Sequence, residues 1–430
     1  MMNKKRMIIF IVMILLITMI CYPKKITIRI GIFAGSNWDV PSGDCYQIID
    51  DAIQIFEEKY PLINVEYESG ILKDDYSNWL SELYLKGGEP DVFMVLSEDF
   101  NTLSSLGALE NLESFMQKDK DFSVDHYYEN SLQAGIYQNK QYALPYESNP
   151  TLMFVNKTLL DNENIDIPSN DWTLDDFYEI CQKVSQDTNH DGYIDQFGCY
   201  NFTWLDSVYC HGVSLFDEEG TKCYLSDAGI KDAITFVQKL NTLNQGHTIT
   251  ATEFDKGSVA FMPMPFSQYR TYMPYPWRVK KYFSFEWDCV KMPSLKEKTN
   301  TTEMSTLLMG ISSRSSHLKE SWEFLKLLTY NENIQKQLFQ YSQGISPLKS
   351  VVQSSEALSL LGDDILLNSQ VDMGLLNEIM ENTLNHSQFK KYDSALSLID
   401  KNITDIIFNK EDIDLSLMSL QKEINQYLNE

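Results

Sequence analysis

The sequence predicts an α/β fold built on parallel β-strands. Residues 26–33 alternate between polar and apolar side chains and then become apolar, as expected of a strand that enters a buried sheet. Residues 48–60 carry apolar side chains at helical spacing and end at a proline, and residues 65–67 give a second strand. A strand–helix–strand unit of this kind joins two parallel strands through a right-handed crossover.

The same pattern repeats further along the chain. Residues 76–86 read as an amphipathic helix that ends at two glycines, and residues 90–96 read as a buried strand. Because ligands of open α/β sheets bind at the carboxyl ends of the strands, we expect the loops at 36–39 and 97–99 to lie on one edge. Two later helices are predicted over 172–184 and 228–243.

The N-terminus predicts export. Lys4, Lys5 and Arg6 precede an apolar run over residues 7–20, which is shorter than the roughly 20 residues of a full membrane span. Residues 1–21 are therefore a signal peptide or a membrane anchor. One interpretation is a lipoprotein modified at Cys21. The other is an uncleaved anchor, because Ile20 stands where the lipoprotein signal has a small residue. Either version tethers the protein to the extracellular face of the cell membrane, and clean release after cleavage of the signal is the remaining alternative.

Length and composition limit the classes of fold, ligand and metal site that the chain can have. About 405 residues follow the signal, which suits two lobes better than one core. The formal net charge of −26 argues against binding to nucleic acid. The seven cysteines contain no CxxC pair, so a metal–thiolate site is not expected. Cys199, Cys210 and Cys223 are spaced for a local disulfide or, equally, act as small buried apolar residues.

Several ordered motifs resemble those of the bacterial family 1 extracellular solute-binding proteins, which include maltose- and oligosaccharide-binding proteins. They are GEPDV at 88–92, LP at 144–145 with FVNK at 154–157, WT at 172–173, FDKGSVAFM at 254–262, VKMP at 290–293, GIS at 310–312 with SWEFL at 321–325, and GISP at 344–347.

This resemblance implies a two-lobed, periplasmic-binding-protein-like fold of type II, with the ligand held in a cleft between lobes joined by hinge segments. Residues 26–149 plus about 265–327 would form the first lobe, and residues 150–264 plus about 328–430 the second. The chain would cross between lobes near 146–151, 262–266 and 327–331.

The implied function is capture of a mono- or oligosaccharide by hinge closure and its delivery to the permease of an ABC importer, by a monomer that requires no cofactor. A sensory protein that reports its ligand to a membrane kinase is an alternative on the same fold. A secreted glycoside hydrolase is a further alternative, but GxSxG, HExxH and glycine-rich phosphate loops are absent from the sequence, so no enzyme is predicted.

Sugar sites combine aromatic faces with planar polar groups. On the first lobe the candidates are Asn37, Trp38 and Asp39, which follow the first strand. Glu98 matches a carboxylate position that binds sugar hydroxyls in the family. The alternative for Trp38 is packing on the lobe surface, and the alternative for Glu98 is a solvated charge.

At the first crossing the candidates are Tyr146, Glu147 and Asn149, since hinge residues often reach ligand. Trp204 falls where the second lobe of the family often supplies a stacking aromatic. The alternatives are turn chemistry for the first three and core packing for Trp204.

The return crossing departs from the family pattern. Met-Pro-Met-Pro-Phe at 262–266 replaces a segment that usually carries glycine and an aromatic residue, and Met264 and Phe266 are candidates to line the cleft. Tyr275 and Trp277 lie in an aromatic loop that follows. An aromatic cleft also suits peptides or quaternary amines, so the ligand class stays open here.

Residues 187–195 resemble the start of a calcium-binding EF-hand loop. Candidate ligands are Asp187, Asn189, Asp191, Tyr193 and Asp195. The sixth position is a glycine, as required, but the twelfth is also a glycine where a bidentate glutamate is needed. The alternative is a plain Asp/Asn/Gly turn, and any bound ion would be structural.

Overall fold

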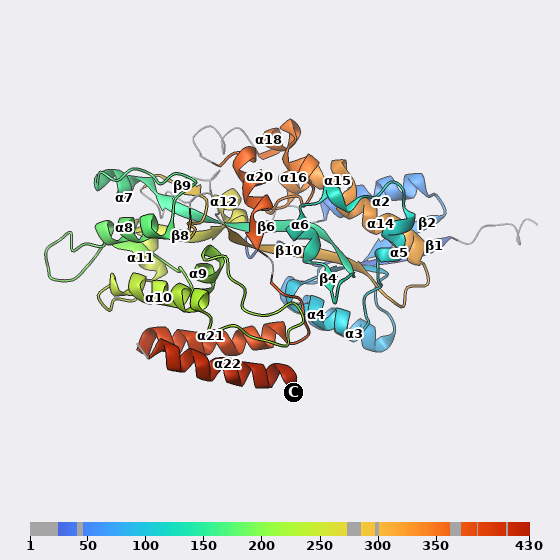
Figure 1. Cartoon of the computed structure of the whole chain (residues 1–430). Coiled ribbons are helices and arrows are strands. Elements are labelled where there is room, and N and C mark those ends of the chain that lie inside the picture. The colour runs from blue at the N-terminus through green and yellow to red at the C-terminus, as the bar shows by residue number, and fades with distance from the viewer. Residues whose placement is uncertain are drawn as a thin grey trace, which may run out of the picture.

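The computed structural model describes residues 25–40, 46–272, 285–296, 301–361, 371–384, 386–409 and 412–430. One large mixed sheet runs through the molecule in the order β2-β1-β3-β10-β6-β8-β7, with β9 beside β6 and β11 beside β10 (Figure 1). The strands of this sheet are β1 (Ile26–Gly31), β2 (Ile63–Tyr67), β3 (Val92–Val95), β6 (Ala143–Asn156), β7 (Phe197–Cys199), β8 (Val259–Pro265), β9 (Trp287–Val290), β10 (Thr302–Ile311) and β11 (Thr383–Leu384). A small separate hairpin pairs β4 (Ile136–Tyr137) with β5 (Lys140–Gln141).

Strand β6 passes from one half of the molecule to the other. Its first part, up to Pro150, pairs with β10, whereas Thr151 onward pairs with β8 and β9. The change of partner falls inside the first predicted crossing at 146–151. One continuous strand therefore connects two α/β halves, and the predicted two-lobed fold is confirmed.

The first lobe is built on the parallel strands β1, β2 and β3. Its helices lie on both faces of the sheet, and Phe56 of α2 packs edge-on against Phe324 of α14 with ring centroids 5.1 Å apart. The helices are α2 (Gln47–Lys59), α3 (Lys73–Lys86), α4 (Ser97–Ser105), α5 (Glu113–Lys118), the 3-10 turn η1 (Val124–His126), α6 (Glu129–Gln133), α14 (Leu318–Tyr330), α15 (Glu332–Lys336), α16 (Leu338–Tyr341), α17 (Lys349–Val352), α18 (Ser355–Leu361) and α20 (Met373–Glu381).

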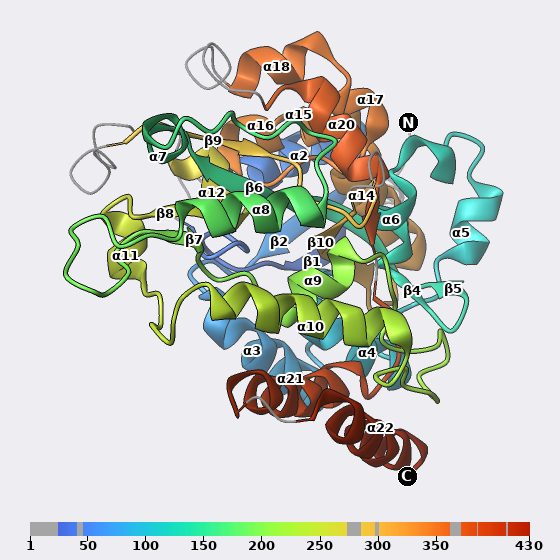
Figure 2. The ribbon, with the colours of Figure 1, turned by 60° about the vertical axis from the view of Figure 1, so that its left-hand side comes forward.

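The second lobe surrounds β7, β8, β9 and the second half of β6. Its separate core is aromatic at the centre, where Phe177 packs against Trp172 and Phe261. The helices are α7 (Lys157–Asn162), α8 (Leu174–Val184), α9 (Trp204–Cys210), α10 (Ala228–Thr242), α11 (Ala251–Asp255), α21 (Tyr392–Asn409) and α22 (Ile413–Asn429), whereas α12 (Phe266–Tyr272) lies at the return crossing. Figure 2 shows α21 and α22 as a pair along one side of this lobe, below α10 and beside α3 and α4.

The division between the lobes near the C-terminus differs from the predicted one. Ile334 and Leu338 lie in α15 and α16, which pack against α2, and Met380 lies in α20, which packs against α6 of the first lobe, although the sequence predicts residues 328–430 to lie in the second lobe. No crossing occurs at 327–331, because α14 continues through that segment and Asn331 caps α15 directly behind it. The chain enters the second core only after β11, with Phe389. The buried apolar residues of α15 to α20 hold this stretch on the first lobe.

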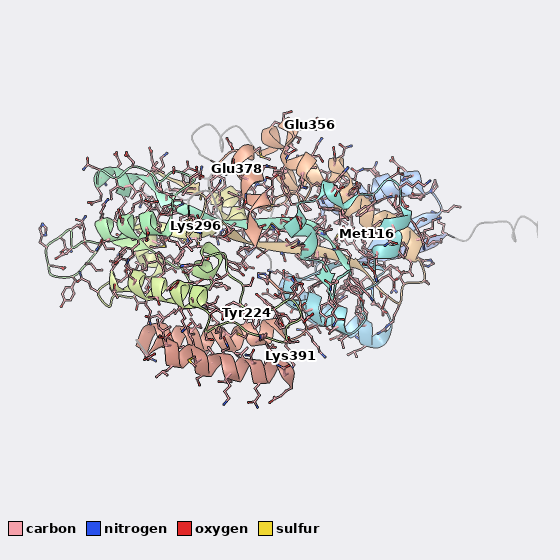
Figure 3. The ribbon with its side chains drawn as sticks, in the orientation of Figure 1. Met116, Tyr224, Lys296, Glu356, Glu378 and Lys391 are labelled. Atoms are coloured by element: carbon pink, nitrogen blue, oxygen red, sulfur yellow. The ribbon has the colours of Figure 1, made fainter. Side chains whose placement is uncertain are left out.

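Lys291 and Glu378 make a further link between the lobes. Lys291 follows β9, and its ammonium lies 2.5 Å from the carboxylate of Glu378 on α20 of the first lobe. Figure 3 labels Glu378 on that helix. Most of the Lys291 side chain is buried, whereas that of Glu378 is exposed. The lobes are therefore linked by an ion pair as well as by strands.

Buried thiols are common in the second lobe. The described cysteines, Cys181, Cys199, Cys210, Cys223 and Cys289, are all free and buried, so 199, 210 and 223 form no local disulfide with one another. Burial raises the pKa of each thiol. These residues act as small apolar core residues. Residues 1–21, with Cys21, lie outside the described residues, and among those described no helix is both long and apolar enough to cross a membrane.

Candidate functional site

The first-lobe candidates gather at the carboxyl edge of the parallel strands, as predicted. The loop after β1 is fixed by Lys73, whose ammonium donates to the main-chain oxygen of Asn37 at 2.6 Å and lies 3.4 Å from the Asp39 carboxylate. Asp39 is largely exposed and has a left-handed backbone, with φ of 54°. Behind β3, Ser77 donates to Asp99 at 2.5 Å. The segments that follow β1 and β3 are thus both tied to α3 at one polar edge.

Trp38 turns inward from this edge toward the hinge. Its side chain is 8% exposed and its indole N–H has no hydrogen-bond partner of good geometry among the described residues. The N–H nevertheless lies close enough to the Glu147 carboxyl to lower the pKa of that group. The structure therefore brings together two predicted residues from distant parts of the sequence.

Glu147 and Arg270 are buried residues of opposite charge that bond to the same turn at the hinge without a direct contact between them. The Glu147 carboxylate accepts from the Ser342 hydroxyl and the Gly344 N–H, both at 2.5 Å. Burial raises its pKa, while these hydrogen bonds, Trp38 and the charge of Arg270 oppose that rise. A Cβ at position 344 would collide with this carboxylate, which explains the glycine of the GISP motif.

The Arg270 guanidinium is likewise held by several hydrogen bonds. It donates to four main-chain oxygens at 2.6–3.2 Å, at the end of α16 and in the turn behind it. Burial lowers its pKa to about 10, which leaves it charged at neutral pH. The pair thus joins α12, directly behind the return crossing, to the body of the first lobe.

The other crossing candidates are also buried in the hinge. The Asn149 side chain and Ser267 exchange hydrogen bonds of 3.1 and 2.9 Å, which tie β6 to α12. Tyr146 is buried, and its main-chain oxygen accepts from Gln335. Met264 lies against Cys289, and Phe266 is fully buried beneath Tyr269. In this conformation these four side chains hold the hinge together.

Trp204 lies in the second core. It is 4% exposed, and its indole N–H donates to the Asp400 carboxylate of α21 at 2.8 Å. The ring therefore holds α9 against α21, as in the core-packing alternative, and leaves little surface for a sugar. Tyr275 and Trp277 lie outside the described residues.

Acidic groups of the two lobes meet beside α4. Glu98, in the first turn of α4, and Asp393, in the first turn of α21, are both exposed. Partial burial raises the pKa of Asp393 and the charge of Glu98 raises it further, whereas Asn101 of α4 opposes the rise. The predicted Glu98 therefore faces a carboxylate of the other lobe.

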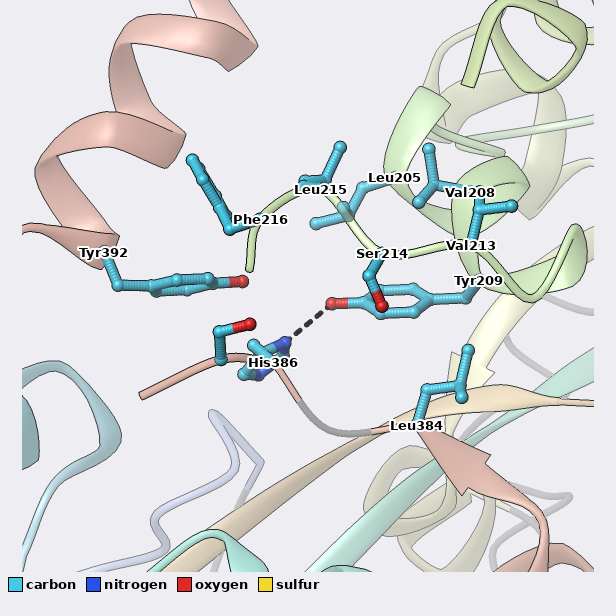
Figure 4. Close-up of a pocket in the computed structure, with 11 residues that line it drawn as sticks. Leu205, Val208, Tyr209, Val213, Ser214, Leu215, Phe216, Leu384, His386 and Tyr392 are labelled. Atoms are coloured by element: carbon cyan, nitrogen blue, oxygen red, sulfur yellow. Dashed lines mark hydrogen bonds between the residues drawn. The ribbon is translucent and has the colours of Figure 1, made fainter. Parts of the chain in front are cut away.

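A cluster that the sequence did not nominate lies next to these carboxylates (Figure 4). The Tyr209 hydroxyl and the Nδ1 atom of His386 are 2.8 Å apart, and the Tyr392 ring lies 5.3 Å from the imidazole. These side chains border a small cavity of about 40 Å³. The charge of Glu303 on β10 contributes to the raised pKa of both tyrosines, after burial as the main cause. No local motif marks His386, because its neighbours come from α9 and α21.

The predicted calcium loop adopts a tight turn closed by its own side chains. Asp187 accepts from the Gly192 N–H at 2.8 Å, and Asp195 accepts from the N–H and hydroxyl of Thr188. The Tyr193 ring is exposed, and the Asn189 and Asp191 side chains accept from main-chain N–H groups. Within the described ranges, no group of three or more His, Cys, Asp or Glu side chains is arranged to hold a metal ion.

Comparison with known proteins identifies the family. The model of the bacterial extracellular solute-binding proteins matches residues 51–359, which is most of the chain. The chain belongs to the bacterial extracellular solute-binding protein family. The motifs at 88–92, 254–262 and 344–347 lie within the matched range.

Solved structures share the two-lobed fold at low identity. The sugar-binding protein MalE of Xanthomonas citri is 14% identical, with a TM-score of 0.75, and the match covers 94% of this chain and 97% of that chain. A cyclic α-maltosyl-1,6-maltose binding protein from Arthrobacter globiformis is 14% identical, with a TM-score of 0.73, and 94% and 99% are covered. An ABC substrate-binding protein from Listeria monocytogenes, in complex with cycloalternan, is 18% identical, with a TM-score of 0.68 and the same coverage.

Proposed function

We propose that this solute-binding protein captures a mono- or oligosaccharide between its lobes, closes on it about the hinge, and delivers it to the permease subunits of an ABC importer. The observation that carries this proposal is the change of partner along β6 between Pro150 and Thr151, because a strand shared by two α/β halves supports a hinge between them. Capture of this kind needs no cofactor and no catalytic group.

The chemistry of the facing edges favours a carbohydrate. Glu98 and Asp393 supply exposed carboxylates, and Tyr209, His386 and Tyr392 supply hydroxyl, imidazole and aromatic groups nearby. Sugars offer hydroxyl rims and apolar faces that match such a set. The proteins of similar fold named above include binders of cyclic gluco-oligosaccharides.

A ligand screen tests capture directly. Purified protein without residues 1–21 is melted with 1 mM maltotriose, cellotriose, mannotriose or glucose, and with a tripeptide and choline as comparison ligands. A ligand present at about 100 times its dissociation constant stabilises the fold by about 2.7 kcal/mol, so a clear rise in Tm is expected with at least one sugar. A rise with the tripeptide or choline alone would replace carbohydrate by that ligand class.

Delivery is tested in cells. Deletion of the gene should abolish uptake of the radiolabelled sugar found in the screen, and the complementing gene should restore it. Unchanged uptake together with a lost transcriptional response would favour the sensory alternative. Release of reducing sugar from the bound oligosaccharide would favour the hydrolase alternative.

Tethering at the extracellular face is part of the same proposal. It is supported by the basic and apolar pattern of residues 1–21. Cys21→Ala should abolish fatty-acid labelling and membrane retention if the anchor is a lipid on that cysteine. Retention without fatty-acid labelling, with residues 1–20 still present in the mature chain, would favour the uncleaved anchor.

A further inference from the structure

His386 lies on the segment that carries the chain from the first lobe back to the second. Leu384 ends β11, which pairs with β10 at Thr302 and Glu303, and Tyr392 begins α21 in the second core. His386 is half-buried between these two points. Its position on an interlobe crossing places the imidazole where the facing edges of the lobes meet.

The orientation of the imidazole is fixed by its neighbours. Nδ1 lies 2.8 Å from the Tyr209 hydroxyl, and the ring packs against Tyr392 with centroids 5.3 Å apart. Tyr209 is itself held, because its main-chain oxygen accepts from the Thr301 hydroxyl at 2.7 Å. Figure 4 shows the Nδ1 edge turned toward Tyr209. Among the described residues, Nε2 has no hydrogen-bond partner.

The protonation state follows from burial and from this hydrogen bond. Burial lowers the pKa of His386, although Asp393 opposes that effect, so the ring is neutral at neutral pH. We assign the Tyr209 hydroxyl as the donor to Nδ1, which leaves the ring proton on Nε2. Nε2–H is then a preorganised donor with no protein acceptor among the described residues.

The groups around this donor are acceptors. Asp393 of the second lobe lies near enough to His386 for its charge to raise the pKa of the imidazole, and Glu98 of the first lobe lies near enough to Asp393 to raise the pKa of that carboxyl. A ligand that satisfies this set must accept one hydrogen bond and donate several, as the neighbouring hydroxyls of a sugar do.

We propose that His386 is a ligand-contacting residue whose Nε2–H donates to a hydroxyl oxygen of the captured sugar, while Asp393 and Glu98 accept hydrogen bonds from its hydroxyl groups. This inference rests on the proposed function and deepens it. It selects ligands with neighbouring free hydroxyls and makes Tyr209 a positioning residue, because its hydroxyl orients the imidazole.

The test is calorimetric titration with maltotriose, cellotriose, mannotriose and glucose. For each sugar that binds the wild type, His386→Phe should lower affinity at least tenfold, since it keeps a ring beside Tyr392 but removes the donor. His386→Gln keeps an N–H near the position of Nε2 and should recover part of that loss. Tyr209→Phe should cost less than His386→Phe.

His126 provides a matched control on the outer surface of the first lobe. Its Nδ1 atom lies 3.1 Å from the Tyr330 hydroxyl, and its ring stacks on Tyr330 with centroids 5.2 Å apart. It therefore reproduces the histidine–tyrosine contact away from the facing edges. His126→Phe should leave the affinity within twofold of the wild type.

The outcomes distinguish failure of the proposed sugar capture from failure of the proposed His386 contact. If none of the four sugars binds the wild type, the proposed function fails and this inference fails with it. If a sugar binds and His386→Phe stays within twofold of the wild type, only the inference fails. Should His386→Phe not fold, nitrogen-15 NMR of the wild type decides, because an Nε2 resonance that is unmoved at sugar saturation overturns the contact.

Discussion

Replacing Arg270 by methionine should destabilise the protein by about 4 kcal/mol. The side chain is 8% exposed and its guanidinium donates to four main-chain oxygens around α16. Methionine fills much of the space but donates no hydrogen bond. The four oxygens then lose a donor, and the buried Glu147 carboxylate loses its countercharge.

The magnitude follows from the burial of the pair. Removing one of two interacting buried charges costs up to about 3–5 kcal/mol, the figure for a buried ion pair, because the remaining charge stays desolvated. The four hydrogen bonds do not add to this figure in full, since the α16 turn relaxes after the change. A value of about 4 kcal/mol takes the middle of the range for a pair whose Glu147 retains Ser342 and Gly344 as donors.

Urea denaturation of Arg270→Met and wild type measures the free energy of unfolding. Lys86→Met is the control, because Lys86 pairs with Glu82 at 2.8 Å and both side chains are largely exposed. That change should cost far less than Arg270→Met, because an exposed ion pair contributes little. The double variant Arg270→Met with Glu147→Gln should lose less than the sum of the single changes, because it leaves no unpaired buried charge.

A loss below about 1 kcal/mol for Arg270→Met would refute the reasoning, since an uncompensated buried carboxylate should cost several times as much. Additive single and double variants would refute the coupling of Glu147 to Arg270 even if each change is costly.

Two further predictions concern α9. Trp204→Phe should lower the free energy of unfolding by about 2 kcal/mol, because the hydrogen bond to Asp400 is lost. Sugar affinity should not change. A tenfold loss of affinity at unchanged stability would show instead that Trp204 contacts the ligand. Burial raises the pKa of Asp206 to about 6, although hydrogen bonds from Thr203 oppose the rise. Between about pH 4 and pH 6 the folded state therefore holds a proton on Asp206 that the unfolded state has lost, so the free energy of unfolding falls as the pH rises through this range. Asp206→Asn should reduce the fall of the urea midpoint between pH 4 and pH 7, because asparagine does not titrate. An equal fall in wild type and variant would contradict the raised pKa of Asp206.

Local sequence patterns predicted the first lobe well. The strand and helices expected at 26–33, 48–60 and 76–86 are observed as Ile26–Gly31, Gln47–Lys59 and Lys73–Lys86. Apolar periodicity within one element determines these segments, so no distant contact is needed to recognise them. The carboxyl edge of β1 and β3 followed from their parallel arrangement.

The residues that local patterns placed poorly depend on distant partners. Trp204 bonds to Asp400, which is 196 positions away, and Tyr209 meets His386 across 177 positions. Neither partner lies in a motif. The stretch around Ile334–Met380 likewise follows the first core because of its packing and not because of any turn or linker signal. The roles of the side chains at the crossings could therefore be recognised only from the folded structure.

The distribution of charge between hinge and cleft edge suits the proposed closure. At the hinge, Glu147 and Arg270 are buried and carry opposite charges. At the edge, Glu98 and Asp393 are exposed, carry the same charge and belong to opposite lobes. Their approach costs free energy in the empty protein. A ligand hydroxyl between them, with His386 as donor, offsets that cost, so closure is favoured only when the ligand is present.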